Sequence, residues 1–451
     1  MTVNKLYPHI IGIKFMKELL VVSYYYHQKT SVASNRTRGI IKYLPEYGWN
    51  VTLLTLNKNH CDYMSSRIGH IGNSCTAELI EFADSLSKKN ENIMAPVSLK
   101  NATLFGFFVK NGVHLFSKIS KYNISSKLFS LLKCLIYPIS SEKRWMKSAL
   151  LLGKHELTRK RYDALLSTYG PAEVHLVCSE FSGIFDIPWI ADYRDHWSLN
   201  EYDVYHFGTT TEKEIQTLIP SIHLTAVSKP IAEDLSQLHK KNVSVIPNGF
   251  DPVQVNPIVP LRDKFTITHT GQLYHGKRDP SLLFRAIDEL LRAGNILREE
   301  ISIEFYGPSS PAVSSQIMEW KMEDIVRMIP TVPKEVSLSL QYSSQILLLL
   351  TWNNPADVGT YTGKVFEYLA AKRPILSLGY LGDCVLSDLM KETQAGVHPF
   401  TYNEVKEQIL SWYTEWKENG CVEYLGVDEK INQYSHRGMA RKFADVLNQY
   451  A

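Results

Sequence analysis

Short apolar runs alternate with amphipathic stretches along almost the whole chain. Residues 18–26 (ELLVVSYYY) and 50–56 (NVTLLTL) are apolar runs of strand length, and residues 34–48 between them begin polar and continue with helical spacing. Apolar runs that do not alternate with polar residues are typical of strands buried on both faces, as in parallel sheets. This order of strand, helix and strand predicts a βαβ unit.

The alternation continues on both sides of a single break. We expect further strands at 162–168, 187–193, 223–228 and 243–248 and, after the break, at 265–271, 301–307, 345–352 and 373–379. Helices are expected at 211–218, 230–239, 280–294, 363–371 and 430–450. The break at 248–260 is rich in Pro and Asn and has no periodicity, so we interpret it as a linker.

This pattern predicts an α/β protein made of two doubly wound, Rossmann-like domains that face each other across a cleft. We place the N-terminal domain at 1–255, the C-terminal domain at 262–427 and a last segment at 428–451. In such open sheets a ligand binds beyond the carboxyl ends of the strands. The residues that directly follow each strand are therefore the first candidates for a site.

One segment of the first domain departs from the alternation. No acidic residue lies between Glu91 and Glu142, and apolar clusters there are mixed with six lysines, Lys100, Lys110, Lys118, Lys121, Lys127 and Lys133. We interpret residues 92–141 as a basic, apolar insertion. The charge pattern fits attachment to an anionic membrane surface, and it fits equally a helical insertion with a solvated basic face.

Composition narrows the class of protein. The chain has 49 Lys and Arg against 46 Asp and Glu, a balance too even for a dedicated nucleic-acid binder. Six cysteines without a CxxC pair predict reduced thiols in a cytoplasmic protein. We expect no membrane-spanning segment and no signal peptide, and we interpret residues 1–15 as a dispensable extension or a start-site artefact. No metal-binding motif is present, so we expect neither a metal nor a cofactor.

Two stretches of the second domain have the features of anion sites. Residues 269–280 follow a strand and open a helix, where Gly271 permits close backbone approach and Lys277 and Arg278 add two cations. A phosphate or diphosphate suits this arrangement, and the alternative is a turn with two solvated basic residues. The second stretch is 359–376, where the helix start is formed by Thr360, Thr362, Gly363 and Lys364.

Glu367 lies one turn after Gly363 on an otherwise apolar helix. A carboxylate in such a place needs a polar partner. A ribose diol is a suitable partner because two hydroxyls can donate to one carboxylate. The alternative is an ion pair with Lys364 or Arg373.

In the first domain, residues 167–176 and 190–198 follow strands. Asp192, Arg194, Asp195 and His196 place four ionisable groups within five positions, which indicates a polar site. The alternative is an internal ion-pair network that shapes the loop. For His196, and for His175, a hydrogen-bonded structural histidine is at least as good an interpretation.

Six blocks in a fixed order carry a resemblance to a known family. They are 167–176, 187–197, 224–235, 245–251, 267–280 and 362–376. With these blocks the chain resembles the bacterial retaining glycosyltransferases of family 4, which have the GT-B fold, from about residue 18 to the C-terminus. Together the blocks are specific for the family, although not for a substrate.

The resemblance implies a nucleotide-diphospho-sugar donor, held mainly by the second domain. Glu367 matches the second Glu of the family's E-x7-E motif, which binds ribose, and Lys277 matches the phosphate-binding Lys. Gly363 and its neighbours match the loop that meets the diphosphate and the sugar. Asp195, with Arg194 and His196, falls in the loop that faces the acceptor, and the helix within 428–451 crosses back to the first domain.

Three positions depart from the family pattern. Gly359 stands where the family's first Glu often lies, and Gln272 replaces an Arg for which Arg278 can compensate. The Gly-Gly loop after the first strand is replaced by 27–36, so we expect Arg36 and Arg38 to do part of its work. With His175 they form the predicted acceptor side.

These features together predict sugar transfer to an acceptor hydroxyl with retention, through a transition state like an oxocarbenium ion. A lipid-linked saccharide in O-antigen, other lipopolysaccharide, capsule or exopolysaccharide synthesis is the expected acceptor, at the inner face of the cytoplasmic membrane. The alternatives are a nucleotide-sugar epimerase or hydrolase of the same fold, and a non-catalytic partner subunit, which Gly359 favours.

Overall fold

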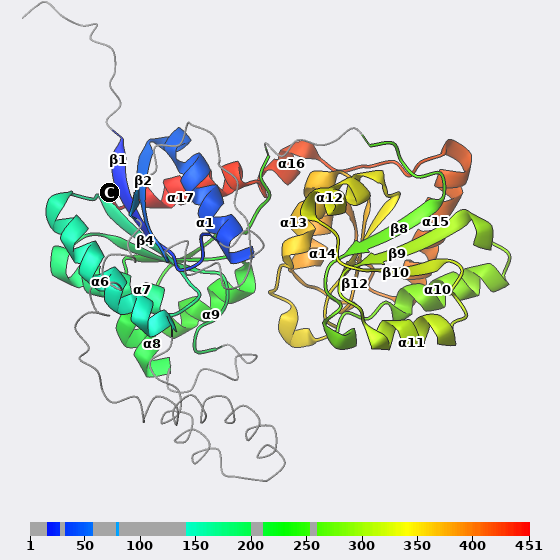
Figure 1. Cartoon of the computed structure of the whole chain (residues 1–451), viewed down its shortest axis with the longest axis horizontal. Helices are drawn as coiled ribbons and strands as arrows, with labels where there is room; N and C mark the ends of the chain where they lie inside the picture. The colour runs from blue at the N-terminus through cyan, green and yellow to red at the C-terminus, as the bar shows by residue number, and fades with distance from the viewer. Residues whose placement is uncertain (1–15, 28–31, 57–77, 81–140, 200–210, 253–258) are drawn as a thin grey trace, which may run out of the picture. The chain divides into compact units, whose positions relative to one another are not determined.

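The computed structural model describes residues 16–27, 32–56, 78–80, 141–199, 211–252 and 259–451 (Figure 1). The predicted insertion at 92–141 therefore lies outside the described residues, apart from its last residue. By contacts the chain divides into two compact units. Unit 1 comprises Met1–Thr37, Gly48–Leu224 and Leu447–Ala451, and unit 2 comprises Arg38–Tyr47 and Thr225–Val446. The domain boundaries predicted at 255, 262 and 428 stay predictions.

The N-terminal half of the chain forms a seven-stranded sheet with the order β3-β2-β1-β4-β5-β6-β7. The pairs β1–β2, β2–β3, β1–β4 and β4–β5 are parallel. The strands are β1 (Lys17–Val22), β2 (Trp49–Leu54), β3 (Glu78–Ile80), β4 (Ala164–Thr168), β5 (Trp189–Tyr193), β6 (His223–Ala226) and β7 (Val243–Val245). Every residue of β4 and β5 is buried, as expected for central strands that are covered on both faces.

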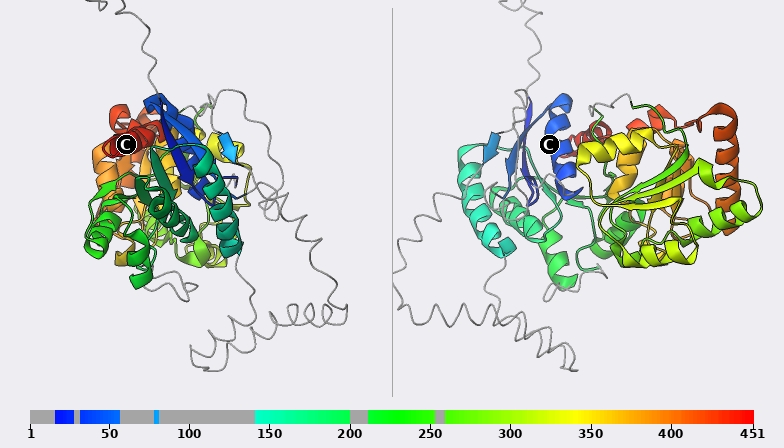
Figure 2. Two further views of the ribbon diagram at one scale, coloured as in Figure 1. Left: turned by 90° about the vertical axis from the view of Figure 1, so that its left-hand side faces the viewer. Right: turned by 45° about the vertical axis from the view of Figure 1, so that its right-hand side comes forward.

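Helices connect these strands, and the order of crossovers reverses between β1 and β4. Helices α6 and α7 pack against each other on one face of the sheet (Figures 1 and 2). The helices of this part are α1 (Val32–Tyr43), the short η1 (Leu44–Tyr47), α6 (Ser141–Arg159), α7 (Glu173–Phe185), α8 (Thr211–Leu218) and α9 (Lys229–His239).

The C-terminal half forms a six-stranded sheet with the order β10-β9-β8-β11-β12-β13, in which all five pairs are parallel. Its strands are β8 (Phe265–Thr270), β9 (Ile301–Tyr306), β10 (Val326–Ile329), β11 (Ile346–Leu350), β12 (Ile375–Leu378) and β13 (Gly396–Val397). Here the crossover order reverses between β8 and β11. The predicted α/β class, with two doubly wound parallel sheets, is confirmed.

Alternate residues of β11 enter two separate cores, which explains its unbroken apolar sequence. Ile346, Leu348 and Leu350 belong to one core, whereas Leu347 and Leu349 belong to the other. Helices α10, α11 and α15 cover the first face, and α12, α13 and α14 cover the second (Figure 1).

The helices of the C-terminal half are mostly short, and all but the last three lie between successive strands. They are η2 (Tyr274–Gly276), α10 (Ser281–Arg292), η3 (Arg298–Glu300), α11 (Pro311–Glu319), α12 (Lys334–Ser343), η4 (Pro355–Asp357), α13 (Gly363–Ala371), α14 (Val385–Thr393), α15 (Tyr402–Asn419), α16 (Asp428–Asn432) and α17 (His436–Leu447). None of the helices in the described part of the chain combines the length and apolar character needed to cross a bilayer.

The single helix predicted at 430–450 is wrong, because the chain turns between α16 and α17. Ser435 makes the break: its hydroxyl accepts the Gly438 N–H at 3.1 Å, and its backbone bridges to Phe250. A serine that satisfies the first amides of a helix favours a new helix start over continuation. The first predicted strand was also too long, since β1 ends at Val22 rather than at residue 26.

Candidate functional site

The candidate site lies at the carboxyl edge of the second sheet, where the crossover order reverses between β8 and β11. Gly271 follows β8 with φ +147°, a backbone conformation that other residues rarely adopt. Its carbonyl packs so closely on Gly307 that a Cβ at residue 307 would lie 2.1 Å from the Gly271 oxygen. The two glycines therefore let two neighbouring strand ends approach each other closely.

Helix α13 begins at this edge with the predicted sequence Thr362–Gly363–Lys364. Thr362 has extended backbone angles, and its side chain accepts the Lys364 N–H at 3.4 Å, so it is the N-cap. Thr360 is exposed, and its N–H donates to the Asp357 carbonyl at 2.9 Å. The first turn of α13 is partly exposed, so the positive end of the helix dipole is accessible to an anion.

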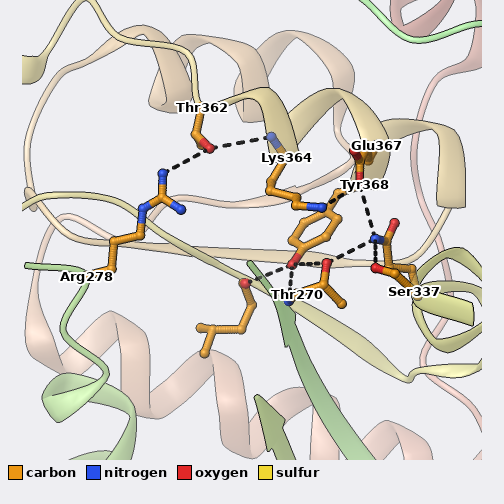
Figure 3. Close-up of polar contacts among 9 residues, drawn as sticks. Thr270, Arg278, Ser337, Thr362, Lys364, Glu367 and Tyr368 are labelled. Carbon is orange, nitrogen blue, oxygen red and sulfur yellow. Dashed lines mark hydrogen bonds and ion pairs between the residues drawn. The ribbon is translucent and has the colours of Figure 1, made fainter. Parts of the chain in front are cut away.

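Glu367 points from α13 toward the same edge and has two polar neighbours (Figure 3). Lys364 Nζ lies 2.8 Å from Glu367 Oε2, and Gln341 Nε2 lies 3.4 Å from the same oxygen. The ion pair with Lys364 was one of the two interpretations predicted for Glu367. Arg373, its other predicted partner, instead donates to backbone carbonyls, that of Ser344 at 2.8 Å among them.

Gln341 and Tyr368 tie this arrangement to β8, and sequence reasoning missed both. Gln341 Nε2 donates to Thr270 Oγ1 at 3.0 Å, and the side chain is fully buried. The Tyr368 hydroxyl accepts the Thr270 N–H at 3.0 Å and donates to the Leu348 carbonyl (Figure 3). Burial raises the pKa of Tyr368 to about 12, so it keeps its proton at neutral pH.

The two predicted cations, Arg278 and Lys277, occupy different places. Arg278 Nη2 lies 3.5 Å from Thr362 Oγ1, and its guanidinium lies 4.7 Å from the centre of the Tyr274 ring. Burial lowers the pKa of Arg278 from its high ordinary value. Lys277 is exposed, and its Nζ lies 4.6 Å from the centre of the Trp352 ring. Arg278 is thus the cation that contacts the start of α13.

His269 is a buried residue beneath the site that sequence reasoning also missed. Its Nδ1 lies 3.0 Å from the Leu348 carbonyl, to which it donates, and its Nε2 has no hydrogen-bond partner among the described residues. A Cβ on Gly271 would lie 3.7 Å from that Nε2. Burial lowers the pKa of His269 to about 4, and the charges of Arg278 and Lys364 act in the same direction. His269 is therefore neutral.

In the N-terminal sheet, two of the polar residues predicted at the end of β5, Asp192 and Arg194, make internal contacts. Arg36 donates to Asp192 through Nε at 2.7 Å and Nη2 at 2.6 Å, and both side chains are fully buried. Arg194 donates to the backbone carbonyls of Tyr169 and Gly170, the latter at 3.3 Å. Of the internal ion-pair network that the sequence allowed as an alternative, the structure shows the ion pair of Asp192, and its partner is Arg36 rather than Arg194.

The remaining predicted residues of the first domain differ in exposure. Asp195 is exposed, and His196 and Arg38 are partly exposed. His175 is fully buried, with Nδ1 2.8 Å from Ser167 Oγ and its ring 4.9 Å from that of Tyr193. The structure thus places His175 as the structural histidine that the sequence also allowed.

The missed residues left little signal in the sequence. Gln341 and Thr270 are 71 positions apart, and they meet only because α12 packs over β8. His269 is set apart only by its position two residues before Gly271. Among the described residues no group of three or more His, Cys, Asp or Glu side chains could hold a metal ion.

No protein-family model matches the chain, and no curated protein matches its sequence. Solved structures do match its fold. A glycosyltransferase from Rickettsia africae has 12% identity and a TM-score of 0.58, with 96% of this chain and 98% of that chain covered. Sucrose-phosphate synthase from Thermosynechococcus elongatus has 13% identity, the same TM-score and the same coverage.

Two further structures extend this comparison. HepE from Anabaena, solved in complex with UDP, has 12% identity and a TM-score of 0.56, and 96% of this chain and 100% of that chain are covered. A putative UDP-N-acetylglucosamine 2-epimerase from Listeria monocytogenes has 10% identity and a TM-score of 0.51, with 96% of each chain covered. At these identities the likeness establishes the fold, and the predicted GT-B architecture of two Rossmann-like domains is confirmed.

Proposed function

We propose that the chain is a glycosyltransferase that moves a sugar from a nucleotide-diphospho-sugar to an acceptor hydroxyl, with retention of the anomeric configuration. The observation that carries this proposal is the arrangement around Gly271. A carboxylate, two cations and a helix start meet at the reversal point of a parallel sheet, within a fold shared with glycosyltransferases. The resemblance of the sequence blocks to family 4 points the same way.

The diphosphate binds, in this proposal, between Arg278 and the first turn of α13. Arg278 already contacts Thr362, and the N–H groups of the turn face the same edge. Lys364 is paired with Glu367. An incoming diphosphate attracts Lys364, and the ribose hydroxyls donate to Glu367 in its place.

The chemistry then depends on the leaving group. As the bond between the sugar and the diphosphate breaks, negative charge grows on the diphosphate oxygens, and the cations Arg278, Lys364 and Lys277 stabilise it electrostatically. The sugar passes through a state like an oxocarbenium ion. We assign no protein nucleophile: the departing phosphate takes the proton of the acceptor hydroxyl, which attacks the same face of the sugar.

The acceptor side belongs to unit 1 in this proposal. Asp195, which is exposed, and His196, which is partly exposed, are the candidates at the carboxyl end of β5. Arg36, Arg194 and His175 are held internally, so we give them the role of fixing the loop that carries Asp195. Arg38, which is partly exposed on α1, was also predicted for the acceptor side, but by contacts it falls in unit 2.

We further propose that the acceptor is a lipid-linked saccharide of surface-polysaccharide synthesis, used on the cytoplasmic face of an anionic membrane. The six lysines within 92–141 support this by charge. The helix that follows them supports it too: α6 exposes Lys143, Arg144 and Lys147 in its first two turns and Leu151 in its third.

The donor site is tested by thermal shift with UDP, GDP, TDP, ADP and CMP. One nucleotide should raise the melting temperature of the wild-type protein, because a ligand that binds only the folded state stabilises it. Glu367→Ala should lose most of that shift, whereas Glu319→Ala, at an exposed position on α11, should keep it. An equal shift in wild type and Glu367→Ala would overturn the ribose assignment.

The alternative functions differ in what they turn over. A nucleotide-sugar epimerase or hydrolase consumes the donor without an acceptor, and the chain is similar in fold to a putative UDP-N-acetylglucosamine 2-epimerase from Listeria monocytogenes. A non-catalytic partner subunit, the interpretation favoured by Gly359, turns over nothing. Donor consumption that depends on an added saccharide acceptor would therefore support the transferase over both.

The membrane proposal is tested by sedimentation with vesicles that contain anionic lipid. Lys143→Glu with Lys147→Glu should weaken binding, and so should Lys118→Glu with Lys121→Glu, since each reversed charge near the surface opposes attraction. Lys334→Glu with Lys430→Glu is the charge-matched control, at exposed positions of unit 2. Unchanged binding in both test variants would contradict the proposal.

A further inference from the structure

Cys384, His398 and Ser377 form a chain of side-chain contacts outside the site described above. The cluster lies next to residues 358–362, which directly precede α13 and which we call the donor loop. Cys384 Sγ lies 3.7 Å from His398 Nε2, and His398 Nδ1 lies 3.1 Å from Ser377 Oγ. The three residues come from separate elements: the start of α14, the residue after β13, and β12. His398 and Ser377 are buried, whereas Cys384 is partly exposed.

The start of α14 adds a second influence on the thiol. Cys384 is the N-cap of this nine-residue helix, and its side chain accepts from the N–H of Ser387 in a capping box. Burial acts to raise the pKa of the Cys384 thiol, but His398 and the amides of Ser387 and Leu386 outweigh it, so the pKa lies below its ordinary value. A neighbouring imidazole and a helix N-terminus both favour the deprotonated, thiolate form of a cysteine, and the thiolate is the nucleophile.

Cys384 is partly exposed, so a small reagent can reach the thiol from solvent. A cavity of about 490 Å³ lies on the other side of the cluster, lined by His398, Ser387 and Phe400, and Cys384 is not among its lining residues. The thiol is also linked to the donor loop. The N–H of Val385 donates to the Val358 carbonyl at 2.9 Å, and Tyr361 packs on the same core as Cys384.

We propose that Cys384 is a nucleophilic cysteine and a site of covalent modification by small hydroperoxides, activated by His398 and by the start of α14. The thiolate attacks the peroxide oxygen that carries hydrogen, an S–O bond forms as the O–O bond breaks, and hydroxide (or an alkoxide) leaves with the electron pair and takes up the proton that the thiol released when it ionised. The cysteine becomes a sulfenic acid and the peroxide is reduced. Val385 contacts Val358, and Tyr361 lies within residues 358–362, directly before α13. The modified protein therefore binds nucleotide more weakly, an effect that rests on the proposed function.

The first test does not depend on the proposed donor site. The native protein is treated briefly with iodoacetamide, and alkylation is measured peptide by peptide. Cys384 should react about tenfold faster than Cys421, which is also partly exposed, and His398→Gln should remove most of that advantage. Equal rates at Cys384 and Cys421, or a fast rate unchanged in His398→Gln, would overturn the proposal.

The second test uses hydrogen peroxide with dimedone to trap the sulfenic acid. Dimedone should label Cys384 in the wild type, and Cys384→Ser should lose that label. Peroxide should reduce the nucleotide-induced thermal shift of the wild type several-fold, a thiol reductant should restore it, and Cys384→Ser should resist. Absence of label at Cys384 would refute the modification site, and label without loss of the shift would refute its link to the donor loop. If no nucleotide binds at all, the alkylation rates still decide on the cysteine.

Discussion

At the scale of single residues, the donor site depends on groups whose charge is set by burial. Glu367 and Lys364 remain about a quarter exposed and can exchange partners, whereas His269 beneath them is enclosed and neutral. A neutral imidazole under two cations avoids adding a third positive charge to a buried place. This makes His269 a determinant of stability that varies with pH.

The expected pH dependence of stability follows from the lowered pKa of His269. The pKa of His269 is about 4 in the folded protein, below the ordinary value of 6.5, so between these values the unfolded chain binds more protons. The contribution of His269 to the free energy of unfolding is complete above about pH 6.5, and it falls by about 3 kcal/mol as the pH drops toward 4. Urea unfolding of wild type and His269→Leu should show a free-energy difference that shrinks with falling pH. Parallel curves would contradict this.

Gly271 offers a second prediction for a single residue. Gly271→Ala introduces only ordinary contacts, the nearest being 3.6 Å from Lys364 Cε, so its cost comes from the backbone at φ +147°. We expect a loss of about 1–3 kcal/mol in the free energy of unfolding, together with weaker nucleotide binding. Gly183→Ala in α7, with nothing within 4 Å, should instead gain up to about 1 kcal/mol. Equal effects of the two substitutions would contradict the backbone argument.

At the scale of elements, α1 and β5 are joined by the buried pair of Arg36 and Asp192. Arg36→Leu leaves a buried carboxylate without its main partner and should cost about 3–5 kcal/mol, whereas Arg36→Leu with Asp192→Leu should recover much of that loss. Breaking the exposed pair of Lys154 and Glu180 should cost at most about 1 kcal/mol. Thermal unfolding of the wild type and of these three variants measures the contrast. A double variant as unstable as Arg36→Leu alone would show that the pair is worth more than apolar packing.

The same pair shows which elements could be predicted from the sequence. The strands were predictable because burial on both faces leaves unbroken apolar runs, as in β8 and β11. The pairing of Arg36 with Asp192 was not, since the two residues are 156 positions apart and their contact depends on the order of strands. The predicted helix at 430–450 was wrong because a single serine, Ser435, outweighed the periodicity.

The residues of the candidate site likewise fall into those that a local sequence pattern predicts and those that it does not. Thr362, Lys364 and Glu367 lie within one helix start, so their local spacing was enough to predict that they share an edge. Gln341 and Tyr368 reach Thr270 from separate helices, and no local pattern marks them. Residues joined through tertiary packing are those that sequence reasoning missed.

At the scale of the whole molecule, every contact that we propose for the donor belongs to unit 2. A nucleotide should therefore slow hydrogen exchange most strongly in the peptides that cover Phe265–Gly276 and Gly363–Ala371. Ligand at 100 times its Kd adds about 2.7 kcal/mol to stability, which slows exchange by up to about 100-fold where an amide exchanges only from the ligand-free state. Peptides of α6 in unit 1 serve as the internal reference. Protection that is greatest in α6 would place the nucleotide in unit 1 and refute the assignment of the donor to Glu367 and its neighbours.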